Sequence, residues 1–178
     1  AGFSGTGKDS IADILKENGY NFITSHTTRP MRDGESEGNP YWFIDKSTML
    51  KYEADGVLIE CRKYNTLVKD IKDTWYYAVH ETEVDPNKPY VVVLDMLGLK
   101  EFKEAYGDRV QGIFVHTPDE VREERAKLRG SFDQIEWDRR LEDDRKEFPK
   151  EMIDKECDFV VHNIELERAA QEVLELIS

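Results

Sequence analysis

The first ten residues constrain this chain more than any other stretch. From Gly2 to Lys8 they read Gly-Phe-Ser-Gly-Thr-Gly-Lys, which fits the pattern G-x-x-x-x-G-K of a phosphate-binding loop. The glycines let successive backbone N–H groups turn toward a polyphosphate, and the lysine reaches its outer oxygens. A helix that begins near Lys8 adds its own N-terminal N–H groups. The stretch predicts a nucleotide ligand. An ordinary Gly/Ser loop between a strand and a helix is the alternative.

One position departs from this pattern. Where the motif has a Ser or Thr hydroxyl for Mg²⁺, the chain has Asp9, followed by Ser10. A carboxylate is a hard oxygen ligand that suits Mg²⁺, and the Ser10 hydroxyl is the other candidate. A loop of this kind follows a buried strand, so we expect the first central strand to lie in residues before Ala1.

Composition excludes several classes of partner. A net charge of −13 over 178 residues argues against nucleic acid and anionic membrane surfaces as partners. No run approaches the roughly 18 apolar residues of a membrane span. Cys61 and Cys157 are far apart and lack metal-ligand spacing, which is typical of reduced thiols in a cytoplasmic protein. The length favours one domain, and the oligomeric state is left open.

Strand and helix patterns alternate along the chain, which favours an α/β fold with a central parallel sheet. Strands are predicted at residues 20–24, 41–44, 57–61, 75–79, 90–94, 110–115 and 158–161. Helices are predicted at residues 8–18, around Met49, and at 99–106, 118–129, 131–148 and 166–177. The polar stretch 62–74 is expected to be irregular.

The two helices predicted between residues 118 and 148 are rich in arginine. For most of these arginines we expect a solvated helical hairpin with i,i+4 ion pairs. The arginines are Arg122, Arg125, Arg129, Arg139, Arg140 and Arg145.

A second motif adds a family resemblance. Residues 27–43 read Thr-Thr-Arg-Pro-Met-Arg-x-Gly-Glu-x-x-Gly-x-x-Tyr-x-Phe, and this stretch resembles the guanylate kinase family. The phosphate loop and four further segments agree in order, so the resemblance covers nearly the whole chain. These segments are Leu94–Gly98, Arg129-Gly130, Arg140-Leu141 and His162-Asn163.

The resemblance implies a P-loop kinase of three parts. The core would comprise residues 1–24, 80–116 and 149–178, with a central parallel sheet flanked by helices. A β-rich lobe at 25–79 would bind GMP, and residues 117–148 would form a helical lid. The implied reaction is Mg²⁺-dependent transfer of the ATP γ-phosphoryl group to GMP or dGMP.

The resemblance also assigns roles to individual residues. The acceptor phosphate would be held by Arg29, Arg32, Tyr41 and Tyr77, and the guanine would be read by Ser25, Glu60 and Asp95. The transferring phosphoryl group would be neutralised by Lys8, Arg129 and Arg140. ATP would contact Gly2, Ser4, Gly5, Thr6, Gly7, Lys8, Asp9, Ser10 and Asn163, with Mg²⁺ at Asp9 or Ser10.

Three departures from the family pattern concern the acceptor lobe and the core. Val79 stands where the family usually has a Ser beside the acceptor phosphate, Ala78 replaces a Gly, and Val93 replaces an acidic residue.

Two other functions stay open. The loop Gly-Lys-Asp-Ser also resembles that of ribose bisphosphate phosphokinases, and non-catalytic guanylate-kinase-like domains bind peptides. The first lack the full 27–43 motif, and the second typically have an eroded phosphate loop.

Overall fold

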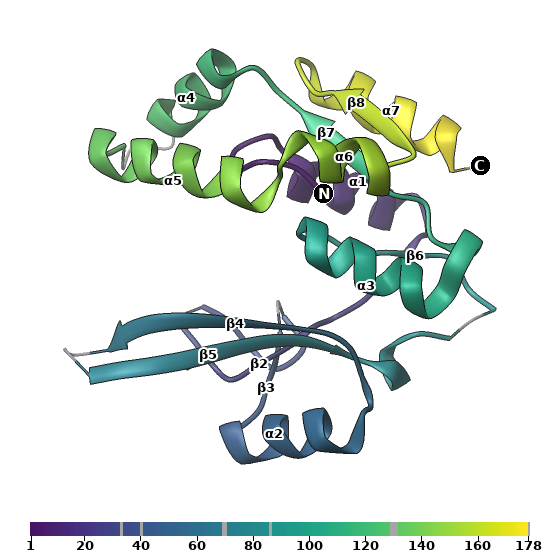
Figure 1. The fold of residues 1–178 in the computed structure, drawn as a ribbon. Helices are drawn as coiled ribbons and strands as arrows, with labels where there is room; N and C mark the ends of the chain where they lie inside the picture. The colour runs from purple at the N-terminus through teal and green to yellow at the C-terminus, as the bar shows by residue number, and fades with distance from the viewer. Residues whose placement is uncertain (33, 40, 69–70, 86, 129–131, 178) are drawn as a thin grey trace. The chain divides into compact units, whose positions relative to one another are not determined.

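The computed structural model describes residues 1–178 except 33, 40, 69–70, 86, 129–131 and 178. The described chain divides into two compact units (Figure 1). The core unit comprises residues 1–20 and 91–178, and the β unit comprises residues 21–90. Each unit has hydrophobic clusters of its own, so each is described by itself.

Two parallel strands form the centre of the core unit. They are β7 (Ile113–His116) and β8 (Phe159–His162), and Val115 lies opposite Val161 in their register. Gly2 forms a parallel bridge to Val115, and the N–H of Val115 donates to the carbonyl oxygen of Ala1 at 2.8 Å. The residues that lead into the phosphate loop therefore lie directly beside β7.

Helices cover both faces of these strands. On one face, Ile11 and Leu15 pack with Val115, Val161 and Val173. On the other face, Phe114 packs with Met96, Leu99 and Phe148. The helices are α1 (Lys8–Glu17), α3 (Met96–Tyr106), α4 (Asp119–Leu128), α5 (Gln134–Glu147), α6 (Lys150–Glu156) and α7 (Leu166–Leu176), with the short 3-10 turn η2 (Gly107–Arg109) after α3.

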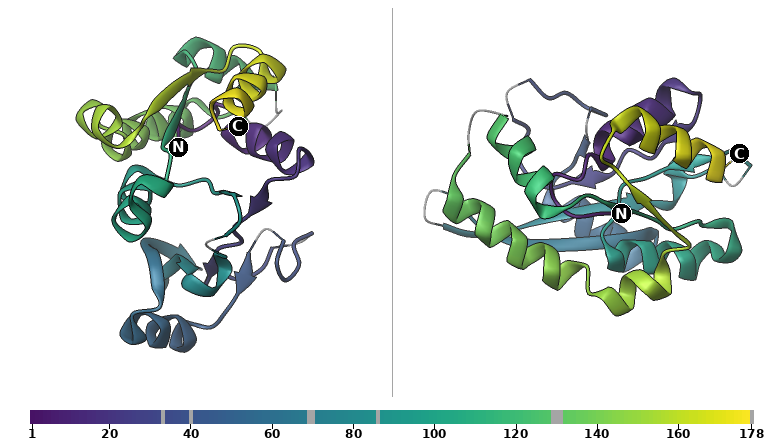
Figure 2. Two further views of the ribbon diagram at one scale, coloured as in Figure 1. Left: turned by 90° about the vertical axis from the view of Figure 1, so that its right-hand side faces the viewer. Right: turned by 90° about the horizontal axis from the view of Figure 1, so that it is seen from above.

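Two of these helices differ from the sequence prediction for a local reason. Helix α3 begins at Met96 rather than Leu99, because Asp95 caps it by accepting the N–H of Gly98 at 2.6 Å. Helix α6 was not predicted, and it begins directly after Pro149. Helices α4 and α5 follow one another at one side of the core unit (Figure 2).

The β unit is a mixed sheet with one helix. Its strand order is β3-β2-β5-β4, in which only β2 and β3 are parallel. Helix α2 (Lys46–Asp55) packs on one face through Met49, against Tyr76 and Ala78. The strands are β2 (His26–Thr27), β3 (Trp42–Phe43), β4 (Leu58–Val68) and β5 (Ile71–His80), and the turn η1 (Glu81–Glu83) follows. A separate pair joins β1 (Asn21–Phe22) and β6 (Tyr90–Val91).

The prediction of an irregular stretch at residues 62–74 is wrong for residues 62–68 and 71–74, and residues 69–70 lie outside the described residues. Strands β4 and β5 pair antiparallel from Leu58↔His80 to Val68↔Ile71 and form a long hairpin. Backbone pairing between adjacent strands does not require an apolar face, so a polar sequence can extend a hairpin beyond the sheet. The strand predicted at 90–94 is also too long, since β6 ends at Val91.

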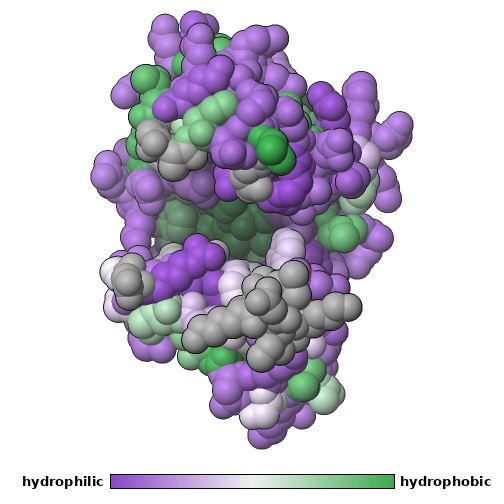
Figure 3. Space-filling view, turned by 90° about the vertical axis from the view of Figure 1, so that its left-hand side faces the viewer, coloured by the Kyte–Doolittle hydropathy of each residue, from purple (hydrophilic) through white to green (hydrophobic). Residues whose placement is uncertain are grey.

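On the face drawn in Figure 3, hydrophilic residues cover most of the described surface of both units. This agrees with the net charge of −13. Among the described residues, every helix is too short or too polar to cross a membrane.

Candidate active site

The phosphate loop closes onto the first turn of α1. Gly7 caps the helix with φ 82° and ψ 15°, a left-handed conformation that favours glycine. A Cβ atom at this position would lie 2.5 Å from Nδ2 of Asn163. Backbone and surroundings therefore both restrict residue 7 to glycine. The first N–H groups of a helix have no partner within it, so the start of α1 offers donors to an anion.

Three polar side chains stand at this helix start. Nζ of Lys8 lies 3.4 Å from the carbonyl oxygen of Phe3, so the lysine side chain curves back over the loop. Asp9 and Ser10 are exposed in the first turn of α1. The structure thus brings the predicted lysine and both predicted metal ligands to one end of the helix.

The carbonyl oxygen of Thr6 accepts hydrogen bonds from three segments that are distant in sequence. It accepts the amide N–H of Asn163 at 2.7 Å, the Thr117 hydroxyl at 3.3 Å and the Arg125 guanidinium at 3.5 Å. Arg125 also donates to the carbonyl oxygens of Asn163 and Ile164. Asn163, predicted beside the donor adenine, therefore supports the loop directly. Its contact with adenine stays a prediction.

A buried ion pair holds the other side of the loop. Asp144 of α5 accepts the backbone N–H of Ser4 at 3.0 and 3.1 Å and the Ser4 hydroxyl at 3.1 Å. Arg122 of α4 donates to Asp144 and to the Ser4 carbonyl oxygen, each at 2.7 Å, and pairs with Asp119. The side chains of Arg122 and Asp144 are only 1% and 5% exposed.

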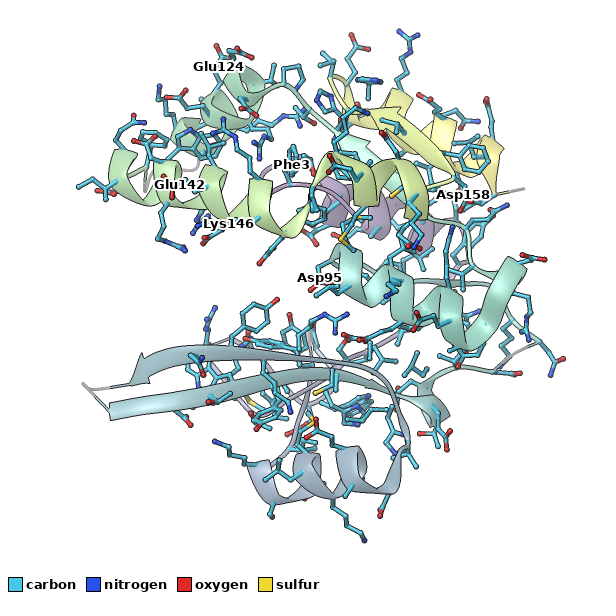
Figure 4. The ribbon with its side chains drawn as sticks, in the orientation of Figure 1. Phe3, Asp95, Glu124, Glu142, Lys146 and Asp158 are labelled. Carbon is cyan, nitrogen blue, oxygen red and sulfur yellow. The ribbon has the colours of Figure 1, made fainter. Side chains whose placement is uncertain are left out.

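Aromatic rings enclose the Arg122 guanidinium. Its carbon lies 4.9 Å from the ring centre of Phe3 and 5.5 Å from that of Trp137. Phe3 lies in the loop, between the strands and α5 (Figure 4). The solvated position expected for most arginines between residues 118 and 148 therefore does not apply to Arg122, and Arg125 also contacts the loop. Arg122 and Arg125 are three residues apart, so both lie on one side of α4, and this spacing is the signal in the sequence that both could contact the loop.

Arginines of α5 follow the sequence prediction more closely. Arg139 pairs with Asp143 one turn along α5, and Lys146 pairs with Glu142 on an exposed part of the same helix (Figure 4). Arg140 is exposed on α5. Arg129, predicted to neutralise the transferring phosphoryl group, lies outside the described residues.

Asp95 has a structural task in addition to its predicted one. It stands at the N-terminal end of α3 (Figure 4), where one carboxylate oxygen caps the helix. It belongs to the core unit, whereas Ser25 and Glu60, the other predicted guanine contacts, belong to the β unit. A carboxylate accepts several hydrogen bonds, so capping and base recognition are compatible.

In the β unit, Arg29 is nearly buried and firmly held. Its guanidinium donates to both carboxylate oxygens of Glu35, at 2.5 and 2.7 Å, and is 4% exposed. It lies over the rings of Tyr41 and Phe43, 5.2 and 5.4 Å from their centres. Glu35 thus fixes the orientation of the guanidinium, which has five N–H groups and can donate to a phosphate through those that Glu35 does not bind.

Glu35 also binds the backbone of Arg32, the second arginine predicted to hold the acceptor phosphate. Oε2 of Glu35 accepts the backbone N–H of Arg32 at 2.8 Å. The Arg29 guanidinium, with help from this N–H, holds the pKa of Glu35 at about 2, below its ordinary value of 4.5. The hydrogen bond with Glu35 raises the pKa of Arg29 in turn. Glu35 is thus charged at neutral pH, and the Arg32 side chain is exposed beside it.

Two predicted tyrosines meet on the sheet. The rings of Tyr41 and Tyr77 are 5.5 Å apart between centres, and Tyr64 lies 5.5 Å from Tyr77 on its other side. Arg29, Tyr41 and Tyr77, all predicted to hold the acceptor phosphate, are therefore neighbours. Ser25, at the edge of β2, is half-buried, and its carbonyl oxygen accepts the N–H of Trp42.

A β-bulge sets the direction of Glu60. The register of β4 and β5 shifts between Leu58 and Glu60, after which Glu60 lies opposite Val79. A bulge inserts an extra residue and so reverses the facing of the residues that follow. Leu58 consequently packs with the α2 cluster, whereas Glu60 is buried on the opposite face. Oε2 of Glu60 lies 4.0 Å from Nε of Arg62 on that face.

Among the described residues, no group of three or more His, Cys, Asp and Glu side chains could hold a metal ion by itself. Mg²⁺ commonly binds through one or two protein oxygens together with substrate phosphates and water. The exposed oxygens of Asp9 and Ser10 at the loop fit that mode of binding.

The loop at the start of α1, on a helix-covered core with parallel strands, defines a nucleotide-binding protein of the P-loop class. A second cluster, of arginine and tyrosine on the β unit, contains the guanidinium and hydroxyl donors that commonly bind phosphate in proteins.

Comparisons with known proteins give the family. The family model described as guanylate kinase matches residues 1–178. A guanylate kinase of Legionella pneumophila (strain Lens) is 29% identical over 98% of this chain and 81% of its own length. One of Chlorobium chlorochromatii (strain CaD3) is 32% identical over 90% and 83%. A crystal structure of guanylate kinase from Anaplasma phagocytophilum superposes with a TM-score of 0.68 and 26% identity, over 99% of this chain and 81% of that chain. The chain belongs to the guanylate kinase family, and the predicted α/β fold class is confirmed.

Proposed function

We propose that this protein transfers the γ-phosphoryl group of ATP to GMP or dGMP and releases ADP with GDP or dGDP. The observation that supports the proposal is that one chain carries two separate groups of residues of the types that bind phosphate. The loop with Lys8 belongs to the core unit, and the cluster of Arg29, Tyr41 and Tyr77 belongs to the β unit. Transfer between two nucleotides needs one site for the donor and one for the acceptor.

At the donor site, the chain positions and neutralises charge without a covalent intermediate. Lys8, Arg129 and Arg140 are proposed to stabilise the charge that develops on the transferring phosphoryl group. The loop N–H groups would bind the ATP phosphates, and Asn163 would stand beside the adenine. Residues 117–148 would act as a lid that excludes water around the nucleotides.

At the acceptor site, the base and the phosphate are recognised by different side chains. Arg29, Arg32, Tyr41 and Tyr77 would hold the phosphate. Ser25 would donate to the guanine O6. The carboxylates of Glu60 and Asp95 would accept from its N1–H and its amino group. Adenine has neither the N1–H nor the 2-amino group and would lose these hydrogen bonds, which is the physical basis for selecting guanine.

The proposal includes Mg²⁺ as the metal that neutralises the ATP phosphates. Asp9 or Ser10 would supply a protein oxygen, and phosphate oxygens and water would complete the coordination. A Mg²⁺ titration of Asp9→Asn and Ser10→Ala distinguishes the two residues, because only loss of the true ligand raises the Mg²⁺ concentration needed for half-maximal rate.

The two other functions are less favoured. A ribose bisphosphate phosphokinase would not need the guanylate-type cluster around Arg29, and a peptide-binding domain would not need Lys8 in a well-formed loop. The thiols of Cys61 and Cys157, which are not joined in a disulfide, support the proposed cytoplasmic location.

A coupled assay of ADP release with GMP, dGMP, AMP and ribose bisphosphate tests the reaction. We expect turnover with GMP or dGMP only. Lys8→Ala should lower this turnover about 100-fold or more, because it removes a preorganised charge at the transferring group. Unchanged turnover in a folded Lys8→Ala protein, or equal rates with ribose bisphosphate, would refute the proposal.

A further inference from the structure

One row of side chains crosses the whole sheet of the β unit on the face opposite α2. Phe43 lies opposite Thr27, Thr27 lies opposite Tyr77, and Tyr77 lies opposite Arg62. Directly opposed residues on neighbouring strands have their side chains on the same face, with Cβ atoms about 5 Å apart. The row therefore runs over β3, β2, β5 and β4 and ends at Arg62.

The same row carries the acceptor cluster. Arg29 lies over Phe43 at one end of the row, and Tyr41 contacts Tyr77 near its middle. Arg62 stands at the other end, beside Tyr77. Two guanidinium groups consequently flank the tyrosine pair, from β4 on one side and from the loop after β2 on the other.

Arg62 is held on this face rather than extended into solvent. Its side chain is 14% exposed, its Nη1 donates to the carbonyl oxygen of Cys61 at 3.1 Å, and its Nε lies 4.0 Å from Glu60. A guanidinium has five N–H groups in a planar fork, so it can keep these contacts and still donate to a phosphate oxygen. The neighbouring Val79, which lies opposite Glu60, offers no side-chain donor.

The sheet face opposite α2 therefore carries a cationic side chain, Arg62, that lies outside the motif at residues 27–43. The charge of Arg29 is already matched by Glu35, which binds its fork through both carboxylate oxygens. We propose that Arg62 is a further binding residue for the phosphate of the acceptor nucleotide and supplies hydrogen bonds that Val79 cannot make. This inference rests on the proposed function of the same face.

Equilibrium binding of GMP and of guanosine to Arg62→Gln tests the inference, because the two ligands differ only in the phosphate. We expect the dissociation constant for GMP to rise about tenfold or more, as for a lost charged hydrogen bond, and that for guanosine to stay unchanged. Arg62→Lys, which keeps the charge without the fork, should fall between wild type and Arg62→Gln.

Lys63→Gln is the matched control. Lys63 is the next residue on β4, faces α2, and pairs with Glu53 at 2.6 Å. Its removal should leave both dissociation constants unchanged. A general electrostatic effect of one lost positive charge would affect Lys63→Gln and Arg62→Gln alike, and that result would overturn the inference.

The remaining outcomes are also distinct. Equal losses for GMP and guanosine in Arg62→Gln would show that Arg62 acts on the base or on folding, which overturns the phosphate role. Thermal melting of the variant separates those two causes. If wild type does not bind GMP, the proposed function itself fails. If wild type binds GMP and Arg62→Gln binds it equally well, only the role of Arg62 fails.

Discussion

At the scale of single residues, the ion pair of Arg122 and Asp144 links two helices of the core unit to the phosphate loop. Both side chains are nearly buried, and together they satisfy the N–H, the carbonyl oxygen and the hydroxyl of Ser4. A buried charge is tolerated only when it is paired and hydrogen-bonded. The conformation of the phosphate loop at Ser4 therefore depends on two helices far along the chain.

Asp144→Asn should lower the free energy of unfolding by about 3 kcal/mol, because it leaves the buried Arg122 charge with Asp119 as its remaining carboxylate partner. Urea denaturation measures the change. Asp143→Asn is the control, since Asp143 is 45% exposed and pairs with Arg139 on the surface. Its loss should stay below about 0.5 kcal/mol. Similar losses in both variants would contradict a special role for the buried pair.

At the scale of elements, the ends of helices and strands determine where site residues point. The bulge between Leu58 and Glu60 turns Glu60 and Arg62 to the face opposite α2. Asp95 fixes the start of α3 through the N–H of Gly98. In both places a candidate site residue depends on the geometry of the element that carries it.

Two substitutions separate the cap of α3 from base recognition. Asp95→Ala should lower the free energy of unfolding by about 0.5–2 kcal/mol, whereas Asp95→Asn should leave it nearly unchanged, because asparagine caps a helix about as well. If Asp95 reads guanine, both variants should use GMP poorly. Denaturation curves and GMP saturation curves provide the two readouts. A large loss of stability in Asp95→Asn would show that the charge, not the cap, matters to folding.

At the scale of the whole molecule, each unit contains a histidine that resists protonation. Burial, with a smaller effect of His80, lowers the pKa of His26 in the β unit. Burial, with smaller effects of His162 and Arg122, lowers the pKa of His116 in the core unit. Both imidazoles therefore take up protons less readily in the folded protein than in the unfolded chain.

The unfolded chain consequently binds more protons below its histidine pKa of about 6.5. The stability that depends on these residues is complete above that pH and is lost as the pH falls from about 7 toward 5. Unfolding free energies of wild type, His26→Gln and His116→Gln over this range test the expectation. Each variant should show a shallower fall than wild type. Parallel curves would mean that neither histidine contributes to the pH dependence.

The sequence by itself determined the features that depend on contiguous residues. The loop from Gly2 to Lys8, the motif at residues 27–43 and the apolar stripe of α7 each have a local pattern with a local physical cause. These patterns were sufficient for the α/β class and the family. They also predicted Arg29, Tyr41 and Tyr77, which the structure places together.

Tertiary structure decided which residues far apart in sequence support the site. Asp144 contacts Ser4 from 140 positions away, and Asn163 contacts Thr6 from 157 positions away. Arg62 faces Tyr77 only because a bulge shifts the register of β4. Helical spacing and strand alternation describe one element at a time. Whether a charged side chain is buried, and which face of the sheet a side chain occupies after a bulge, are decided only when elements pack together. No local pattern in the sequence could therefore specify either.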